Sequence, residues 1–586
     1  MMSETANNSV NNSPLLHGAN GNNPYYKPYG HGHFHDDDVN VSVNLDDSLL
    51  DEASTDTFST VLRTYLGKIK VTTPQSFSRP MMTFVFALSG VVSAAVAVAL
   101  FYCLQSSDRF IGDTPYLYTN QTPLIFLVLP CGFIGINFLL RTVFAGAEGS
   151  GIPQAKIFYD EVKQPNDNLG FRVLFGKFFL TVLLLFLGGS AGKEGPTVAM
   201  SCSVFIVLVT LSFKLFPEIT KSSFSGKKGD DLEFYVRAGL VASSAAGIAT
   251  AFSTVLGGIV FSIEEFSSTW NPRFGRLTLV SVVSATMSVF LMSYLIDKDY
   301  EDLTYYGFVY SHSTVTELLT CSFGSGLFGG FLGGVNCTLL ILGLKFKALT
   351  NRRSASAGYA WAVFGGLSLA GIGWLTDGKV YGEGTLYVQQ VLTTDVYCAT
   401  NETDGGDYEH PSQISEYGAM KMLATTVTYL SGVCGGIFAP SFSAGAGFGT
   451  NYYCLVSRHI HPGIDVTFVV LLTMVGFFSG LTQCPLTSFT ILVGMLYIEN
   501  EPQNQVTCYT GMLCSAVIGS FVSKLFNPMS LYDAMAEVIV EGNERDLKPV
   551  EKDWALAKFI RERIFFQNPG GKNELLTEEI AAASER

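Results

Sequence analysis

Long apolar stretches recur along the chain between residues 81 and 523, separated by short polar segments. Five of them are long enough to predict helices that cross all or most of a membrane, since a full crossing takes about 20 apolar residues. These five stretches span residues 81–104, 122–140, 173–187, 279–295 and 467–480. Other stretches are shorter or broken by glycine, and we expect tilted or half-spanning helices there, covered by protein or by an aqueous cavity. The pattern predicts an all-helical, multi-pass integral membrane protein of the transporter type.

Composition agrees with a lipid-facing protein and excludes several functions. Hydrophobic residues make up 48% of the 586 positions and charged residues 15%, whereas a soluble domain carries about 25% charge. The net charge of -14 argues against a nucleic-acid partner, because phosphate binding needs clustered Lys and Arg. The eleven cysteines include no CxxC pair, so we predict neither a metal site nor a disulfide framework.

The chain divides into three regions. Residues 1–53 are polar and rich in asparagine, without the apolar core of a signal peptide, and we expect a disordered cytosolic tail. Residues 54–540 form one transmembrane domain. Residues 541–586 form a short cytosolic C-terminal segment that is too small for a core of its own.

Charged loops predict the orientation in the membrane. Basic residues favour the cytosolic side for the loops that carry them, at positions 273, 276, 345, 347, 352 and 353. The segments 297–314 and 395–410 are acidic, and we expect them on the exoplasmic side. Glycosylation sequons at Asn120 and Asn401 point to the same side for their loops.

Three glycine-proline elements interrupt the apolar pattern: Gly-Ser-Gly-Ile-Pro at 149–153, Gly-Lys-Glu-Gly-Pro at 192–196, and Gly-Gly-Ile-Phe-Ala-Pro at 435–440. Each predicts a helix start, because proline is favoured in the first turn and glycine permits a sharp bend before it. Unpaired N-H groups and about half a positive charge at such an end attract an anion without trapping it. Any single element is also compatible with a simple kink.

In order and separation, the three elements resemble the anion-binding motifs of the CLC family of chloride channels and chloride/proton exchangers, and the resemblance runs from about residue 56 to residue 541. It implies two inverted halves, near residues 81–296 and 315–523, around a site at mid-membrane. It also implies a homodimer with one pathway in each subunit. Chloride and protons would be the transported substrates, and no cofactor is implied.

The resemblance also implies a set of chloride-binding residues. Ser150 matches a serine whose hydroxyl binds the central ion, and Tyr532 matches a tyrosine whose phenol reaches the same ion. Ile437 and Phe438 match positions that contribute backbone N-H groups. The same elements supply Gly151, Ile152 and Gly195. Serine at position 150 resembles the chloride-selective members, whereas nitrate-preferring relatives carry proline there.

Glu194 is the most informative single residue. A carboxylate at membrane depth is costly and is functional by default, unless it forms a structural ion pair. The adjacent Lys193 is a poor partner, since neighbouring residues on a helix do not face each other. The resemblance identifies Glu194 as the gating glutamate: ionised, it competes with chloride for the helix-end site, and protonated, it moves away.

Glu265 decides between two modes of transport. Taken alone, Glu264 and Glu265 look like an ordinary acidic helix end. The resemblance identifies Glu265 as the internal proton acceptor of the exchangers, which pure channels usually replace. Lys177 matches a conserved helix lysine, and the resemblance suggests that it supports the internal acidic cluster. We therefore predict a chloride/proton antiporter, with a passive voltage- or pH-gated chloride channel as the alternative and a scaffold or sensor without transport as a third possibility.

Departures from the family pattern complete the predictions. Eukaryotic relatives generally end in a paired CBS module, and none follows residue 540 here, so we do not expect adenine-nucleotide binding. The chain contains no HExxH and no GxSxG motif, and we do not expect an enzyme. By analogy with eukaryotic exchangers, an endosomal, lysosomal or vacuolar membrane is favoured over the plasma membrane.

Overall fold

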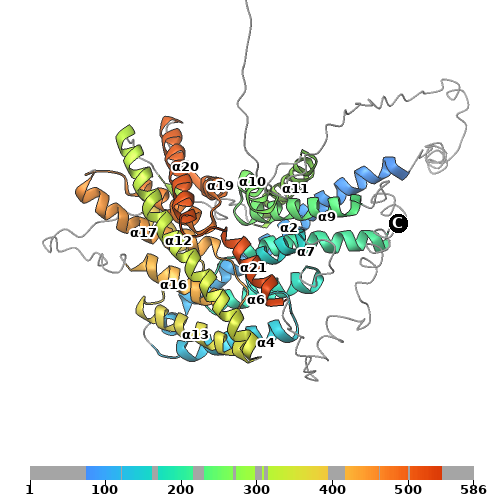
Figure 1. Ribbon diagram of the computed structural model, residues 1–586, viewed down its shortest axis with the longest axis horizontal. Coiled ribbons are helices and arrows are strands. Elements are labelled where there is room, and N and C mark those ends of the chain that lie inside the picture. The colour runs from blue at the N-terminus through green and yellow to red at the C-terminus, as the bar shows by residue number, and fades with distance from the viewer. Residues whose placement is uncertain are drawn as a thin grey trace, which may run out of the picture. The chain divides into compact units, whose positions relative to one another are not determined.

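The computed structural model is almost entirely helical (Figure 1). It describes residues 74–119, 122–160, 169–215, 230–267, 272–296, 306–308, 314–354, 356–393, 416–460, 462–498 and 502–543. The predicted tail at 1–53, most of the C-terminal segment and the acidic segment 395–410 lie outside these residues.

The first half of the described chain contains ten helical elements: α2 (Pro74–Asp113), α3 (Pro115–Tyr118), α4 (Ile125–Thr142), α5 (Ile152–Asp160), α6 (Phe171–Phe186), α7 (Glu194–Leu215), α9 (Asp230–Ala251), α10 (Val255–Phe261), the π-helical segment η2 (Ser262–Ser267) and α11 (Pro272–Ile296). The second half contains α12 (Val315–Arg353), α13 (Ala357–Leu375), α14 (Thr385–Thr393), α16 (Tyr417–Leu430), α17 (Phe438–His459), α18 (Val466–Thr482), α19 (Pro485–Met495), α20 (Pro502–Lys524) and α21 (Leu531–Asn543).

Strands β1 (Tyr306–Phe308) and β2 (Leu496–Ile498) are the exception to the all-helical prediction within the described residues. They form a parallel pair, with Tyr306 opposite Leu496 and Phe308 opposite Ile498. This short pair ties the connection between the two halves to the end of α19 through backbone hydrogen bonds.

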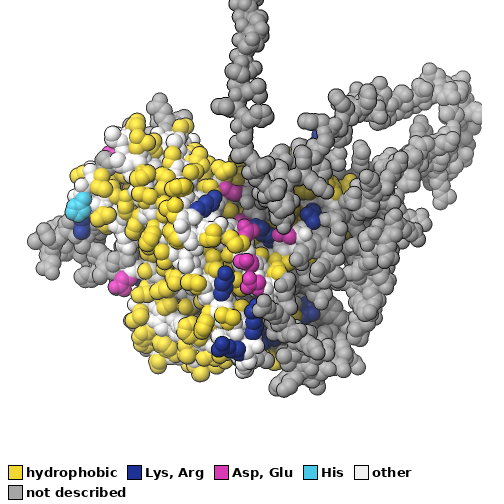
Figure 2. Space-filling model, viewed as in Figure 1, with side chains coloured by type: hydrophobic (Ala, Val, Ile, Leu, Met, Phe, Trp, Pro, Cys, Tyr) yellow, Lys and Arg dark blue, Asp and Glu magenta, His cyan; other side chains and the backbone are white. Residues whose placement is uncertain are grey.

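Seven helices in the described part of the chain are long and apolar enough to span a membrane. They run from Met81–Asp113, Ile125–Thr142, Glu194–Ser212, Phe274–Ile296, Val315–Arg353, Ala357–Leu375 and Gln505–Lys524. Large hydrophobic side chains stay exposed on these helices, for example Leu295 at 71% and Leu375 at 74%, and Figure 2 shows hydrophobic side chains over much of the described surface on the visible face. Together these features confirm an integral membrane protein.

Two of the predicted apolar stretches are shorter helices. Residues 173–187 correspond to α6, and residues 467–480 lie in α18, whose side chains from Thr467 to Thr482 are all buried. α18 packs between α12, α17 and α20, and Figure 1 shows α12 beside α20. An apolar run alone does not distinguish a lipid-facing helix from a helix at the protein core.

Helices of the two halves pack in matching order. In the first half, α2 packs against α9 and α11, and in the second half α12 packs against α18 and α20. Likewise α7 contacts α6 and α9, as α17 contacts α16 and α18. The halves meet where α4 packs against α13 and α10 against α19. This matching order is the arrangement expected of two structurally repeated halves.

Glycines allow the closest helix contacts in the second half. A Cβ at Gly330 of α12 would overlap the Cα of Gly519 in α20, and a Cβ at Gly333 would overlap the carbonyl oxygen of Phe477 in α18. Small residues of this kind let helix backbones approach closely in membranes. α12, α18 and α20 therefore pack backbone to backbone in the second half.

Candidate functional site: an anion cradle between two buried glutamates

The three glycine-proline elements meet in space and each precedes a helix. The Gly149 N-H donates to the Val433 carbonyl and the Gly435 N-H to the Gly149 carbonyl, both at 3.2 Å. Gly192 and Gly436 exchange two backbone hydrogen bonds of 2.8 and 2.7 Å. α5, α7 and α17 begin at Ile152, Glu194 and Phe438. The N-terminal ends of three helices are thereby fixed against one another, as the sequence predicts.

Two buried hydroxyl groups face this junction. Among the described residues, neither the Ser150 hydroxyl nor the Tyr532 hydroxyl has a hydrogen-bond partner. The Tyr429 hydroxyl comes near Ser150 without hydrogen-bond geometry, and donates instead to the Met535 sulfur at 3.5 Å. Both hydroxyls are neutral donors near the three helix starts and are open to a ligand.

Backbone and ring contacts place the remaining cradle residues. A Cβ at Gly195 would lie 2.7 Å from the Ser150 Cβ, so the absence of a side chain there lets the first turn of α7 approach Ser150. Ile437 caps α17 without a side-chain hydrogen bond, which leaves the helix end to a ligand. The Phe438 ring lies 5.8 Å from the Tyr532 ring, centroid to centroid. Ile152 belongs to the same buried cluster as Ile437, Phe438 and Tyr532.

Glu194 occupies the end of α17. This residue is 1% exposed, and its Oε2 accepts a hydrogen bond of 3.4 Å from the Ala439 N-H. A Cβ at Gly192 would overlap the same oxygen, so glycine is required there for this rotamer. The adjacent Lys193 pairs with Glu383, at 3.5 Å between Nζ and Oε2, and not with Glu194. The carboxylate of Glu194 therefore sits where a helix N-terminus would hold an anion.

Glu265 is buried rather than a surface helix end. It lies in η2 and is 1% exposed. Its Oε1 is 2.9 Å from the Lys156 Nζ, and its Oε2 accepts from the Cys484 thiol at 3.1 Å. Glu264 has a different task, because it accepts hydrogen bonds from the backbone N-H groups of Leu486 and Thr487 at the start of α19. The π-helical turn thus separates the two neighbouring glutamates, a geometry often found at functional sites.

The lysine at the internal cluster is Lys156, which the sequence analysis missed. Lys156 bridges Glu265 and Asp533, with an Nζ to Oδ1 distance of 2.5 Å to the latter. Lys177 is fully buried and donates to the carbonyls of Glu148 and Gly149, each at 2.8 Å, so its described contacts are with the turn that carries Ser150. The sequence could have indicated Lys156, because it follows the first glycine-proline element by only three residues and a cation at membrane depth needs a partner.

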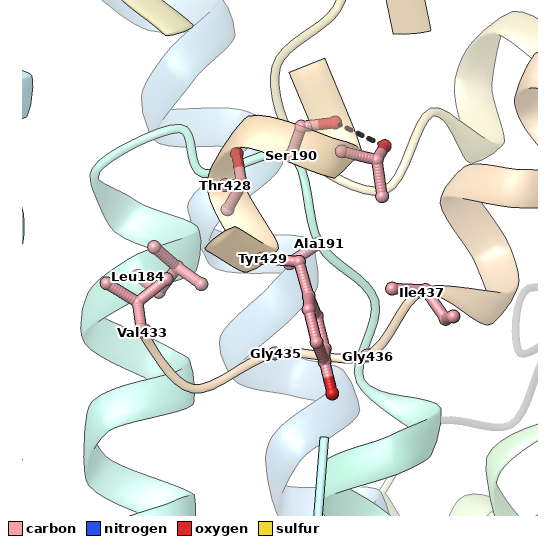
Figure 3. Close-up of a pocket in the computed structure, with 10 residues that line it drawn as sticks. Leu184, Ser190, Ala191, Thr428, Tyr429, Val433, Gly435, Gly436 and Ile437 are labelled. Carbon is pink, nitrogen blue, oxygen red and sulfur yellow. Dashed lines mark hydrogen bonds between the residues drawn. The ribbon is translucent and has the colours of Figure 1, made fainter. Parts of the chain in front are cut away.

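A small cavity borders the junction (Figure 3). It is lined by residues that include Ser190, Thr425, Tyr429, Gly436 and Ile437. Ser190 and Thr425 hydrogen-bond to each other across 3.0 Å. Neither Ser150 nor Tyr532 lines this cavity. The open hydroxyls, and not the cavity, therefore define the candidate site.

Comparison with known proteins gives consistent matches. Residues 132–524 match the family described as voltage gated chloride channel. An uncharacterised chloride channel protein of Schizosaccharomyces pombe is 24% identical over 428 residues, which cover 70% of this chain and 57% of that protein. The chain thus spans little more than half the length of this curated relative. A Vibrio vulnificus protein named H(+)/Cl(-) exchange transporter is 25% identical over 71% of this chain and 81% of its own.

Solved structures share the fold. The crystal structure described as a slow cyanobacterial Cl-/H+ antiporter superposes with a TM-score of 0.59 and 19% sequence identity, over 80% of this chain and 99% of that chain. At this level of identity the likeness establishes the architecture and leaves the chemistry to be argued from the residues themselves.

Proposed function

Because the chain belongs to the voltage-gated chloride channel family, we propose that it exchanges chloride for protons across a membrane. The observation that carries the proposal is the placement of two buried carboxylates on either side of the open hydroxyls: Glu194 at the end of α17 and Glu265 against Lys156. Tyr532 interacts electrostatically with Glu194 and Glu265, which supports a shared site near its phenol. The names of the Vibrio relative and of the cyanobacterial structure agree with this reading.

Competition for one helix end couples the two ions. Chloride would accept from the Ser150 and Tyr532 hydroxyls and from the N-H groups at Ile437 and Phe438, with Gly151, Ile152 and Gly195 shaping the cradle. An ionised Glu194 occupies the same helix end. Once protonated, its carboxyl loses the attraction of the N-H groups and leaves the position to chloride. Proton binding to Glu194 thereby allows chloride to bind, and this couples the movements of the two ions.

Glu265 gives the proton a route away from the anion. Its contacts with Lys156 and Cys484 hold a proton acceptor deep in the protein, near Asp533 of α21. A passive channel needs no such group, and this favours exchange over channel conduction. Lys177 supports the cradle through the carbonyls of the Ser150 turn.

Purified protein in liposomes tests the proposal, with external pH and chloride recorded together under a chloride gradient. Wild type should move protons against chloride. Glu194→Ala should pass chloride without proton coupling, since the competing carboxylate is gone. Glu265→Gln should keep chloride flux and lose chloride-driven proton uptake, because an amide does not release or accept a proton at ordinary pH.

Glu264→Gln is the matched control, because its partners are backbone N-H groups of α19 and the amide oxygen still accepts from them. It should couple as wild type does. Wild-type chloride flux without protons would establish the channel alternative. Normal proton uptake by Glu265→Gln would remove that residue from the proton route.

We further propose a homodimer in an endosomal, lysosomal or vacuolar membrane. Exposed apolar side chains on α10, α11, α19 and α20 offer a subunit interface, for example Leu256, Met287, Leu486 and Val517. A fluorescently tagged chain tests both parts in one experiment: its location in the cell identifies the membrane, and two bleaching steps per particle identify the dimer. Single-step bleaching or plasma-membrane labelling would contradict the respective part.

A further inference from the structure

A second turn has the backbone of the Ser150 turn. Gly149 and Gly151 flank Ser150 with φ of +63° and +86°. Gly382 and Gly384 flank Glu383 with φ of +67° and +84°. Each pair of glycines adopts the left-handed region that other residues rarely enter. The two turns lie in different halves of the chain and differ in their middle residue.

A buried lysine supports each turn in the same way. Lys177 donates to the carbonyls of Glu148 and Gly149, and Lys421 donates to those of Val380 and Gly382 at 2.9 and 2.7 Å. Lys177 precedes Glu194 by seventeen positions, and Lys421 precedes Phe438 by the same number. The Glu383 turn is thus the structural counterpart of the anion-binding turn, with a carboxylate in place of a hydroxyl.

Glu383 reaches the backbone directly beside the gating glutamate. It is 3% exposed, and its Oε1 accepts a 2.9 Å hydrogen bond from the backbone N-H of Lys193, the residue before Glu194. Its Oε2 lies 3.5 Å from the Lys193 Nζ and accepts from the Thr385 hydroxyl at 3.4 Å. Glu383 and Glu194 also interact electrostatically. A second buried carboxylate therefore stands next to the gate.

Asp108 lies beside the Glu383 turn. It is half-buried near the end of α2, and its Oδ1 would lie 3.3 Å from a Cβ at Gly382. Its charge interacts with those of Glu383, Lys193 and Lys421. α2 ends shortly before the loop of the Asn120 sequon, and α14 leads from Glu383 into the acidic segment 395–410. We take this to be the exoplasmic side of Glu194, because the sequence predicts that both connecting segments are exoplasmic.

We propose that Glu383 is a proton-relay residue that, together with Asp108, carries protons between the exoplasmic solution and Glu194. A hydronium ion protonates Asp108, which passes the proton to Glu383 and regains its charge; Glu383 then protonates the Glu194 carboxylate and is ionised again. Transport in the other direction reverses these steps. Lys193 and Lys421 offset the two negative charges while they are ionised. The inference rests on the proposed exchange function.

The same contacts also suit a purely structural role, in which Glu383 only balances Lys193 and Lys421. The two roles differ in their dependence on pH. A lost relay slows protonation of Glu194 most when protons are scarce, and direct protonation from the solvent restores the rate when they are abundant. A lost structural charge changes the rate by a similar factor at every pH.

Glu383→Gln in liposomes, with chloride and proton fluxes recorded together from pH 8 to pH 5, separates the roles. The amide keeps an acceptor for the Lys193 N-H but does not carry protons. At the alkaline end both fluxes should fall together by about a hundredfold or more, the usual effect of removing a proton-transfer group. The deficit should shrink toward pH 5, at an unchanged ratio of chloride to protons. Asp108→Asn, at a half-buried position that tolerates the change, should show a smaller deficit of the same form.

Two further variants sharpen the test. Asp377→Asn removes an exposed carboxylate from the connection between α13 and α14 and should match wild type at every pH. In the Glu194→Ala background no proton step remains, so adding Glu383→Gln should no longer slow chloride. Equal slowing at all pH values, or slowing that persists without Glu194, would overturn the relay. Wild-type rates in both Glu383→Gln and Asp108→Asn would also overturn it, whereas a wild type that moves no protons refutes the exchange function itself.

Discussion

The turn of residues 149–151 and the turn of residues 382–384 share two left-handed glycines and a buried lysine that donates to their carbonyls. They differ in what the middle residue adds. Ser150 leaves a neutral hydroxyl without a partner among the described residues, so a mobile anion can complete the site. Glu383 brings its own negative charge and binds the Lys193 N-H. We therefore propose that the same backbone conformation serves a mobile anion in one half and a fixed carboxylate in the other.

The largest expected effect of this difference concerns stability. Lys421→Met leaves two buried carbonyls unpaired and removes a cation that interacts with Glu383 and Asp108. It should lower the free energy of unfolding by about 3–5 kcal/mol, as expected when one partner of a buried charge pair is removed. Lys177→Met leaves two carbonyls unpaired beside a neutral middle residue, and should cost less, about 1–3 kcal/mol.

Unfolding midpoints in detergent measure both losses. Adding Glu383→Gln should recover part of the loss in Lys421→Met, because it removes the uncompensated charge, and should recover nothing in Lys177→Met. Equal losses for the two lysines, with no recovery in either, would show that the turns do not differ electrostatically.

Local signals in the sequence account for what could be predicted. Apolar runs predicted the multi-pass helical fold, and the comparisons with known proteins confirm the family. Glycine followed shortly by proline marked the starts of α5, α7 and α17 within a residue or two. These signals are short-range, because the residues next to a helix start determine where the helix begins. The roles of Ser150, Glu194 and Tyr532 stay predictions, although the structure brings the three residues to one junction.

Long-range charge pairs could not be predicted in the same way. Lys156 and Glu265 lie 109 positions apart, and Lys193 and Glu383 lie 190 positions apart. No rule of local spacing joins such residues, and the packing of the two halves alone brings them together. The repeated seventeen-residue spacing and the two Gly-x-Gly turns were visible in the sequence, but they acquire meaning only once Lys421 is seen to support the second turn.

The smallest expected effect concerns anion choice at the Ser150 turn. If this turn differs from its counterpart by donating to a mobile ion, Ser150→Pro should weaken the preference for chloride over nitrate, because proline removes both the hydroxyl and the backbone N-H. Ser150→Ala removes the hydroxyl alone and should shift the preference less, by about tenfold, which is near the lower value of one hydrogen bond to a charged group. Chloride and nitrate fluxes through each variant, measured in the same liposomes, give the ratio.

Because both variants leave Glu383 and its lysine in place, a change confined to anion preference would assign the ion to the Ser150 turn. An unchanged ratio in both variants would mean that the transported anion binds elsewhere, and that the two turns differ in sequence without differing in task.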